Sequence, residues 1–269
     1  CSSDLWRDNG TLEMEGRVEK DLQQGKWIFY HPNGKTGSTG DFKDGLRYGE
    51  WVFYYETGEK WKQGVYENDL REGMWTVWYE DGQIHHQGPF SNDKEHGLWK
   101  QWYPDGTLSY QGNFTKGQMD GLWEGWYPSG KIKYRNNYAD NQREGLSQFW
   151  FENGQMKYQG LFSKGMRDGH WTEWSQYGIC IREGDYREDA KEGKWVFYDE
   201  AGVRVQEQNF KNNAPDGNWK SFHMNNKVSA EGNFTNGMKE GTWKYYDETG
   251  KLLRKVIYRN DRKIKDIRD

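Results

Sequence analysis

The sequence is poor in the residues that build a thick aliphatic core. Cysteine occurs twice and proline five times in 269 residues, and hydrophobic residues make up only 33% of the chain. No apolar run reaches the roughly 18 residues that a transmembrane helix needs, so we expect no spanning helix. A globular domain of this length normally buries many branched aliphatic side chains. Because aromatics alone are 17% of the residues, flat rings must supply most of the apolar surface.

Charge and cysteine content exclude two further classes. The chain carries 38 basic and 42 acidic residues, and a net charge of -4 argues against nucleic acid as a partner. The two cysteines, Cys1 and Cys180, are too few for a disulfide framework. The sequence therefore points to neither a polyanion-binding protein nor a small disulfide-rich domain.

A repeat of 24 residues runs through almost the whole chain. Tryptophan follows two residues after each repeat glycine, and Ser147 is the one exception. A period held without a slip indicates one small unit copied many times, each copy packing on the next. An enzyme gathers unlike residues in one cavity, whereas this chain repeats like residues along a line. The repeat glycines are Gly25, Gly49, Gly73, Gly97, Gly121, Gly145, Gly169, Gly193, Gly217 and Gly241.

Other positions of the unit are also fixed. Counting from the repeat glycine as position 0, positions 5 and 17 are always aromatic, and position 15 is usually glycine. Positions 8 and 9 often read Asn-Gly or Asp-Gly, which tolerate positive φ in a two-residue hairpin turn. Turn formers recur near position 20. The flanking segments are short and rich in Trp, Tyr, Phe and Val, so we expect one β-hairpin per unit.

These turns predict the strand register. A loop at positions 8 and 9 places the position 2 tryptophan opposite the position 15 glycine, and the position 0 glycine opposite the position 17 ring. A second turn at positions 20 and 21 repeats both pairings with the next unit. Every ring then covers a glycine on each side. We therefore expect Trp99 to contact both Gly88 and Gly112.

The expected fold is all-β: an elongated single-layer antiparallel ribbon of about ten to eleven hairpin units. Residues 1–24 fit as a degenerate N-terminal capping repeat, 25–261 as ten repeats, and 262–269 as a charged C-terminal tail.

The unit resembles a known repeat. Gly97-Leu98-Trp99-Lys100-Gln101-Trp102-Tyr103-Pro104-Asp105-Gly106, followed by Gly112-Asn113-Phe114 and Lys116-Gly117, is similar to the bacterial variant of the MORN repeat. The chain looks like the YwqK-type antitoxins, which are runs of such units. The resemblance implies an elongated β-hairpin repeat. It also implies a scaffold or protein-binding module, since MORN repeats serve as membrane-associated scaffolds and dimerisation platforms.

No catalytic, cofactor or metal site is expected. The sequence has no nucleophile elbow, Walker loop, dinucleotide-binding glycine motif or Cys-x-x-Cys. The six histidines are scattered, and the adjacent His85 and His86 should point to opposite faces of a strand. Acidic residues recur at position 23, where a solvated turn is favoured over cation binding. We therefore expect a non-enzymatic protein.

The central units carry a paired stripe that predicts a partner-binding surface. Aromatic residues at position 6 are confined to consecutive central units, and aliphatic residues at position 11 are expected to face them. An apolar stripe rimmed by polar units is typical of a binding patch, although local packing explains it equally well. The expected partner-binding residues are Tyr79, Tyr103, Tyr127 and Phe151, and the facing residues are Ile84, Leu108, Ile132 and Met156.

Three functions follow from these features. The favoured hypothesis is a bacterial lipoprotein of the cell envelope, facing the periplasm or cell exterior, that binds a protein partner along its aromatic face. The second is a cytoplasmic immunity or antitoxin protein that neutralises a toxin. The third is a carbohydrate or cell-wall binding module, since Trp and Tyr stripes also stack on sugars. Toxin capping implies a tight one-to-one complex, whereas glycan binding implies weak, multisite and sugar-competable binding.

The membrane hypothesis makes the first testable prediction. A chain that reads Cys-Ser-Ser at residues 1–3 resembles a mature bacterial lipoprotein, so we expect Cys1 to carry lipid. Membrane contact would then be made only through that lipid. Mass spectrometry of the native N-terminal peptide should show the added mass of acyl chains. An unmodified Cys1, or a native chain that continues through it, would contradict the hypothesis.

Overall fold

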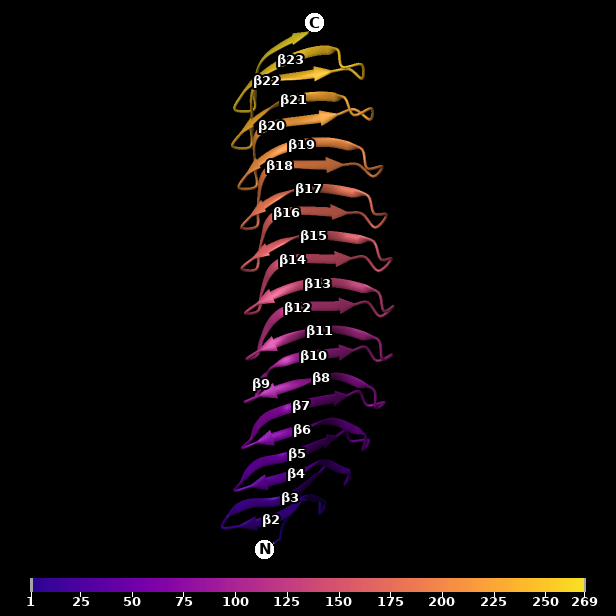
Figure 1. The fold of residues 1–269 in the computed structure, drawn as a ribbon, viewed down its shortest axis with the longest axis vertical. Coiled ribbons are helices and arrows are strands. Elements are labelled where there is room, and N and C mark those ends of the chain that lie inside the picture. The colour runs from indigo at the N-terminus through magenta and orange to yellow at the C-terminus, as the bar shows by residue number, and fades with distance from the viewer. Residues whose placement is uncertain (1, 269) are drawn as a thin grey trace. The chain divides into compact units, whose positions relative to one another are not determined.

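A computed structural model describes residues 2–268, so Cys1, the expected lipidation residue, lies outside the described residues. This part of the chain contains no helix, and hence none long and apolar enough to cross a membrane. Its 24 strands belong to one open antiparallel sheet built of successive hairpins, which confirms the predicted all-β hairpin repeat. The hairpin loops lie at one end of the strands, and the shorter turns lie at the other end (Figure 1).

Contacts divide the chain into two compact units. Unit 1 comprises residues 1–132 and 138–141, and unit 2 comprises residues 133–137 and 142–269. The strands up to this boundary are β1 (Ser2–Trp6), β2 (Leu12–Glu19), β3 (Leu22–Tyr30), β4 (Thr36–Lys43), β5 (Leu46–Tyr54), β6 (Lys60–Glu67), β7 (Leu70–Trp78), β8 (Ile84–Ser91), β9 (Lys94–Glu95), β10 (Gly97–Trp102), β11 (Leu108–Thr115) and β12 (Gln118–Trp126).

The remaining strands begin with β13, which both units share. They are β13 (Ile132–Ala139), β14 (Gln142–Trp150), β15 (Met156–Ser163), β16 (Met166–Trp174), β17 (Cys180–Arg187), β18 (Ala190–Tyr198), β19 (Arg204–Lys211), β20 (Ala214–Phe222), β21 (Val228–Thr235), β22 (Met238–Tyr246), β23 (Leu252–Arg259) and β24 (Arg262–Arg268). Most of the expected charged tail is thus strand β24, which pairs with β23.

The predicted register of tryptophan against glycine is confirmed. Trp99 pairs with Gly112 in the neighbouring strand, and Gly112 also pairs with Trp123 of the next repeat. The ring of Trp99 in turn covers Gly88, where a Cβ atom would lie 2.3 Å from the indole. Each ring leans over the position 15 glycine of the preceding unit. The three atoms nearest to a Cβ at Gly112 all belong to Trp123.

Seven of the position 2 indoles also donate a hydrogen bond to the preceding repeat, whereas the buried Nε1 of Trp243 has no partner. In these seven, the Nε1–H reaches the backbone carbonyl of the residue just after the covered glycine, as from Trp99 to Pro89 at 3.0 Å. One side chain therefore buries apolar surface and satisfies its own donor against the same neighbour. The tryptophans that make this bond, at 2.9–3.2 Å, are Trp27, Trp51, Trp75, Trp99, Trp123, Trp171 and Trp195.

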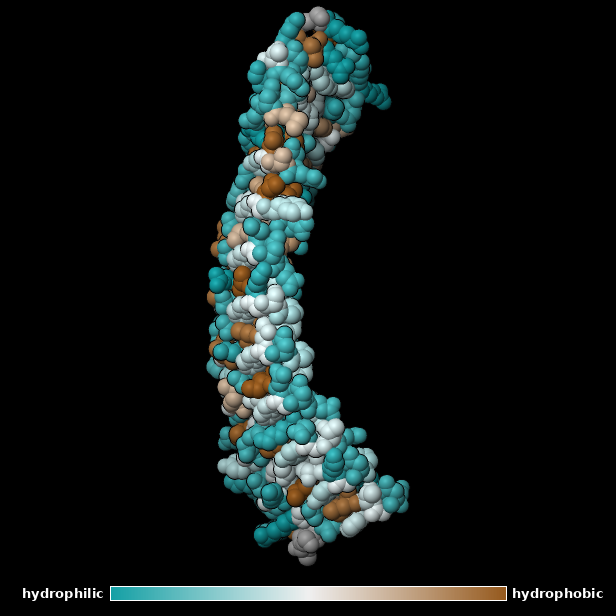
Figure 2. All heavy atoms as spheres, turned by 90° about the vertical axis from the view of Figure 1, so that its right-hand side faces the viewer, coloured by the Kyte–Doolittle hydropathy of each residue, from teal (hydrophilic) through white to brown (hydrophobic). Residues whose placement is uncertain are grey.

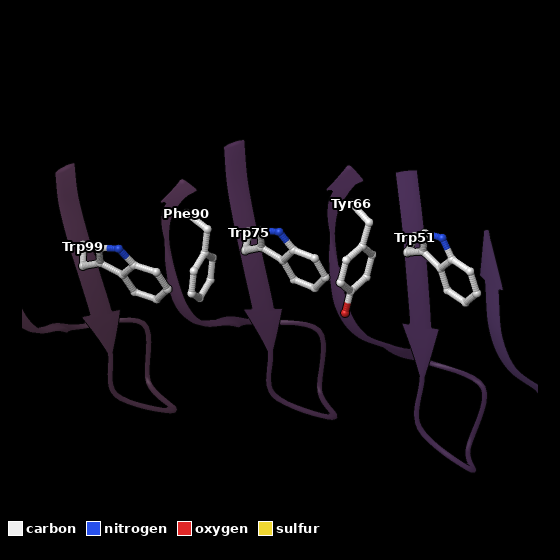
Figure 3. Packing of buried hydrophobic residues seen from close by; sticks show 5 residues of the cluster. All are labelled: Trp51, Tyr66, Trp75, Phe90 and Trp99. Carbon is white, nitrogen blue, oxygen red and sulfur yellow. The ribbon is translucent and has the colours of Figure 1, made fainter. Parts of the chain in front are cut away.

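The rings pack in a cluster within each of the two compact units. In unit 1, Trp51, Tyr66, Trp75, Phe90 and Trp99 are all buried and alternate between the two ring orientations (Figure 3). Trp75 meets Tyr66 at 5.0 Å between centroids, with planes at 80°. Edge-to-face contacts of this kind add to the energy of burial. A second cluster in unit 2 contains Trp171, Tyr186 and Trp195.

Both turns differ from the sequence prediction, which placed them at positions 8–9 and 20–21. The two-residue turn lies at positions 19 and 20, where both residues have positive φ, as at Asn68 (51°) and Asp69 (65°). At the other end of the strands only position 9 has positive φ. The loop there is longer and is closed by a hydrogen bond from the position 6 N–H to the position 10 carbonyl, as from Tyr103 to Thr107. The side chain at position 8 accepts the N–H of position 10 and stabilises that loop, as Asp105 does.

The position 0 glycine has a different role from the one expected. We expected the position 17 ring to face the next unit's glycine, but Phe114 pairs with Met119. The turn at positions 19 and 20 forces this pairing, and the register recovers through a bulge at Gly121 and Leu122. The repeat glycine adopts positive φ there (71° at Gly121), and a Cβ would meet nothing within 4 Å. Backbone conformation, not a covering ring, requires this glycine.

Exceptions to the pattern support the packing account. Asn136 replaces the position 15 glycine where Ser147 replaces the tryptophan, and the Ser147 hydroxyl donates to Asn136 Oδ1 at 2.5 Å in a buried pair. Gln208 also occupies position 15, but there Trp219 is retained. Among the position 2 tryptophans, Trp219 alone is only half-buried. A side chain at position 15 and a buried tryptophan in the following repeat therefore exclude each other.

This exclusion predicts a compensating pair of substitutions. Gly112→Asn adds a side chain whose Cβ would lie 2.1 Å from the Trp123 ring, so we expect destabilisation of about 3 kcal/mol. Trp123→Ser alone should cost about 3–5 kcal/mol through lost burial. The double variant copies Asn136 and Ser147, so its loss should be smaller than the sum. Urea unfolding of the full chain measures all three, and simple additivity would contradict the packing account.

Candidate interaction surfaces

The expected partner-binding rings lie in the hairpin loops of four successive repeats. Tyr79, Tyr103, Tyr127 and Phe151 are all half-buried and begin these loops. Figure 2 views the edge of the sheet that carries the loops, and it shows hydrophobic side chains between hydrophilic ones. Whether these residues bind a partner stays a prediction.

The facing residues differ from the expected ones. Position 11 was expected opposite position 6, but Leu108 pairs with Trp102, which is position 5. The same pairing joins Ile84 to Trp78 and Met156 to Trp150. The cause is a register shift just before the loop, which leaves position 12 unpaired. The predicted contact of ring and aliphatic stripe across the hairpin is therefore wrong.

The tyrosine hydroxyls at position 6 join adjacent repeats. The hydroxyl of Tyr79 donates to the carbonyl of Trp102 at 2.9 Å, and that of Tyr103 donates to the carbonyl of Trp126 at 2.9 Å. His31, which occupies position 6 of its own repeat, places Nε2 3.0 Å from the carbonyl of Tyr54. A polar atom at position 6 thus recurs as a link to the next repeat, which gives these residues a structural role.

The bulge before each loop also brings two histidines together. His85 and His86 were expected on opposite faces, but their Nδ1 atoms lie 3.2 Å apart. His85 is the unpaired position 12 residue, so the strict alternation of side chains fails there. Among residues 2–268, no group of three or more His, Cys, Asp and Glu side chains could hold a metal ion.

The acidic column at position 23 stabilises turns. Glu72 accepts the backbone N–H of Asn92 at 2.6 Å, and Glu240 accepts that of Asn260 at 2.8 Å. Each carboxylate therefore binds the first residue of the next two-residue turn. These carboxylates therefore bind turns and do not converge as a set of ligands for a cation.

Titrating groups with large pKa shifts are also inter-repeat links. A hydrogen bond to Glu15, together with burial, raises the pKa of Tyr30 to about 12. Burial, followed by the hydrogen bond to Glu183, raises the pKa of Tyr198 to about 12, and Tyr246 behaves in the same way beside Glu231. Each hydroxyl therefore stays protonated at neutral pH and can donate its hydrogen bond to the carboxylate. The three pairs occupy equivalent positions 5 and 14, as a structural contact would.

An exposed apolar stripe lies on the face opposite the tryptophans, and the sequence reasoning missed it. We define the position 1 stripe of unit 1 as Met74, Leu98 and Leu122, with 55%, 44% and 45% exposure. Neighbouring residues alternate between faces, so each points away from the tryptophan that follows it. In unit 2, Leu146 (43%) pairs with Leu161 (44%).

The stripe is confined to consecutive repeats. In the remaining repeats position 1 is polar or charged: Lys26, Glu50, His170, Lys194, Asn218 and Thr242. The first residue of the stripe, Met74, also has an apolar strand partner, Pro89 at position 16. The signal was readable as a run of Met, Leu, Leu and Leu at a 24-residue spacing. Burial alone would not explain it, since these side chains are exposed.

The structural role of position 6 makes a testable prediction. Tyr103→Phe removes only the hydroxyl that donates to Trp126, so the free energy of unfolding should fall by about 1 kcal/mol. Thermal or urea unfolding measures the change. Tyr177→Phe is the control, because Tyr177 is 77% exposed and should tolerate the change. Equal stability of Tyr103→Phe and the native chain would show that the link contributes nothing.

The chain has only low similarity to solved structures. No curated protein matches the chain. The crystal structures of TcdB2-TccC3, TcdB2-TccC3-TEV and TcdB2-TccC3-Cdc42 are 10%, 10% and 9% identical, with TM-scores of 0.19, 0.20 and 0.17. The alignments cover 98%, 95% and 95% of this chain but only 15% of each of those chains.

The family match is independent of those structures. The profile of the MORN repeat variant matches eight segments, each running from one two-residue turn to the next. They are residues 23–44, 47–68, 71–92, 95–116, 119–140, 143–164, 191–212 and 239–260. Because these segments cover more than half of the 269 residues, the chain belongs to the MORN repeat variant family.

Proposed function

We propose that this MORN repeat chain is a non-enzymatic scaffold that binds a protein partner through the position 1 stripe of unit 1. The observation that carries the proposal is the exposure of Met74, Leu98 and Leu122 in three successive repeats. Contiguous exposed apolar patches on soluble proteins mark interaction sites more often than isolated exposed side chains do. A repeat scaffold supports such a surface, because it holds equivalent residues at a fixed spacing.

The surroundings of the stripe resemble the rim of an interface. Position 14, on the same face, is mostly polar, with Gln63, Gln87 and Gln111 in unit 1. Gln111 Nε2 donates to Glu124 at 3.1 Å and Gln63 donates to Glu50, so this rim is ordered within the sheet. An apolar centre with a polar rim is the usual anatomy of a protein–protein contact.

The opposite face is less suited to a protein partner. Its tryptophans are largely buried by neighbouring repeats, with Trp51 2% and Trp75 4% exposed. A partner would gain little apolar area there. The position 6 rings predicted from the sequence are half-buried and remain the alternative contact surface, although the hydroxyls of Tyr79 and Tyr103 already bond the next repeat.

The location of the scaffold is a further part of the proposal. A lipid on Cys1 would hold the scaffold at the cell envelope, and the mass measurement of the native N-terminus tests it. The protein partner would then be an envelope protein, or a toxin if the chain acts as an immunity protein. A tight one-to-one complex with a toxin, or weak binding that soluble sugar displaces, would separate the two other hypotheses from this one.

The proposed contact is tested with charge substitutions in the stripe. Leu98→Glu with Leu122→Glu should weaken partner binding at least 30-fold, the effect of losing about 2 kcal/mol at an interface centre. The melting temperature should not fall, because both side chains are exposed. The partner is first identified by pulldown from the native organism with mass spectrometry, and affinity is then measured with purified proteins.

Two controls make the test decisive. Thr242→Glu introduces the same charge at position 1 of a repeat outside the stripe, and it should bind normally. Tyr103→Ala with Tyr127→Ala tests the alternative surface. If the partner tolerates both charges in the stripe but loses affinity with the tyrosine variant at equal stability, the position 6 rings are the contact and the proposal is wrong.

A further inference from the structure

A hollow of about 380 Å³ opens on the tryptophan face of unit 1, away from the position 1 stripe. Its wall includes the aromatic layer of Tyr66, Trp75, Phe90 and Trp99, which Figure 3 shows side by side. Three basic side chains, Arg47, Lys62 and Arg71, also line it. The volume is within the range of small-molecule sites.

The two arginines are held in fixed positions. The guanidinium of Arg47 lies 4.0 Å from the centroid of the Tyr66 ring, and its Nε donates to Asp69 Oδ1 at 2.8 Å. Arg71 has the same arrangement one repeat later. Its guanidinium lies 3.8 Å from the Phe90 centroid, and its Nε donates to Asp93 Oδ1 at 2.5 Å. Each arginine is thus stacked on a ring and paired with one carboxylate.

Lys62 has no such carboxylate. Its strand neighbours in register are Phe53 and Val77, and its ammonium lies 4.5 Å from the Phe53 centroid and 4.3 Å from that of Trp61. Within residues 2–268, no carboxylate lies within ion-pair distance of Lys62. Burial, followed by the charges of Arg71 and Arg47, lowers the pKa of the Lys62 ammonium.

Unit 2 contains a related arrangement in which the counterpart of Lys62 is paired, although Lys191 and Asn213 stand there in place of Arg71 and Asp93. Arg167 lies 4.0 Å from the Tyr186 centroid and pairs with Asp189 at 2.8 Å, as Arg47 does with Tyr66 and Asp69. Arg182 occupies the position of Lys62, and Glu173 occupies that of Phe53. Arg182 Nη2 donates to Glu173 at 2.7 Å. In the unit 1 hollow, the three cations Arg47, Lys62 and Arg71 are lined up with only two carboxylates, Asp69 and Asp93, in a chain of net charge -4.

We propose that the unit 1 hollow binds a small oxyanion with a carboxylate, sulfate or phosphate group. Its negative charge takes the place beside Lys62 that Glu173 fills beside Arg182 in unit 2. Lys62 supplies the unpaired charge, and Arg47 and Arg71 supply further N–H donors at its rim. Guanidinium forks match the geometry of such oxyanions. This site is independent of the proposed protein-binding stripe, which lies on the other face.

The test measures citrate, sulfate and phosphate binding to the full chain by isothermal titration calorimetry at low ionic strength. We expect at least one of these anions to bind with a stoichiometry of one. Lys62→Met should weaken that binding about tenfold or more, the usual effect of losing one charged hydrogen-bond donor. Lys60→Met is the matched control, since its exposed ammonium bonds Gln63 in the same strand and does not line the hollow.

Reciprocal substitutions separate a built site from general charge attraction. Phe53→Glu supplies the missing carboxylate and should abolish binding. Glu173→Gln leaves Arg182 unpaired and should create a second site, raising the stoichiometry to two. Circular dichroism checks that each variant is folded, and Lys62→Met carries the test if Phe53→Glu does not fold. Absence of binding for all three anions, or unchanged binding by folded Lys62→Met, would overturn the proposal.

Discussion

The contact of each tryptophan ring with the bare backbone of the preceding repeat governs the rest of the structure. The indole covers the position 15 glycine so closely that a Cβ atom would lie 2.1–2.4 Å from the ring. The same side chain donates its N–H to the carbonyl of the next residue. In most repeats one residue thus supplies burial, register and donor satisfaction. A sheet that lacks a second layer can therefore remain ordered although few aliphatic side chains are available.

Much of this was predictable, because periodicity reports which residues share a face. The pairing of Trp99 with Gly112 followed from counting alone. The bulge at Gly121 could not be counted, because a pattern of glycines does not show whether a glycine is needed for space or for positive φ. The same limit hid the contact between His85 and His86, and the pairing of Leu108 with Trp102. In each case an unpaired residue shifts the pairing locally, and the register beyond it is kept.

The exceptions show what the contact permits. Where Ser147 replaces tryptophan, position 15 admits Asn136, and the buried pair satisfies its polar atoms by a hydrogen bond. In the last repeat, Val256 is buried at position 15 because its strand partner is Asp266 and no tryptophan follows. Gln208 breaks the rule, and Trp219 is displaced toward Trp243, with ring centroids 5.0 Å apart. The glycine is thus dictated by the neighbouring repeat, not by its own.

Function is therefore left to the positions that this contact does not use. Position 1 faces away from the ring and varies freely, which explains how Met74, Leu98 and Leu122 could become exposed without cost to packing. Positions 4 and 13 border the rings and vary in charge, from Phe53 beside Lys62 to Glu173 beside Arg182. These sites were hard to predict because they are departures from the repeat, while pattern analysis weights what recurs. In a repeat protein, the recurring residues explain the fold, and the positions that change from one repeat to the next are where a particular ligand or partner can be selected.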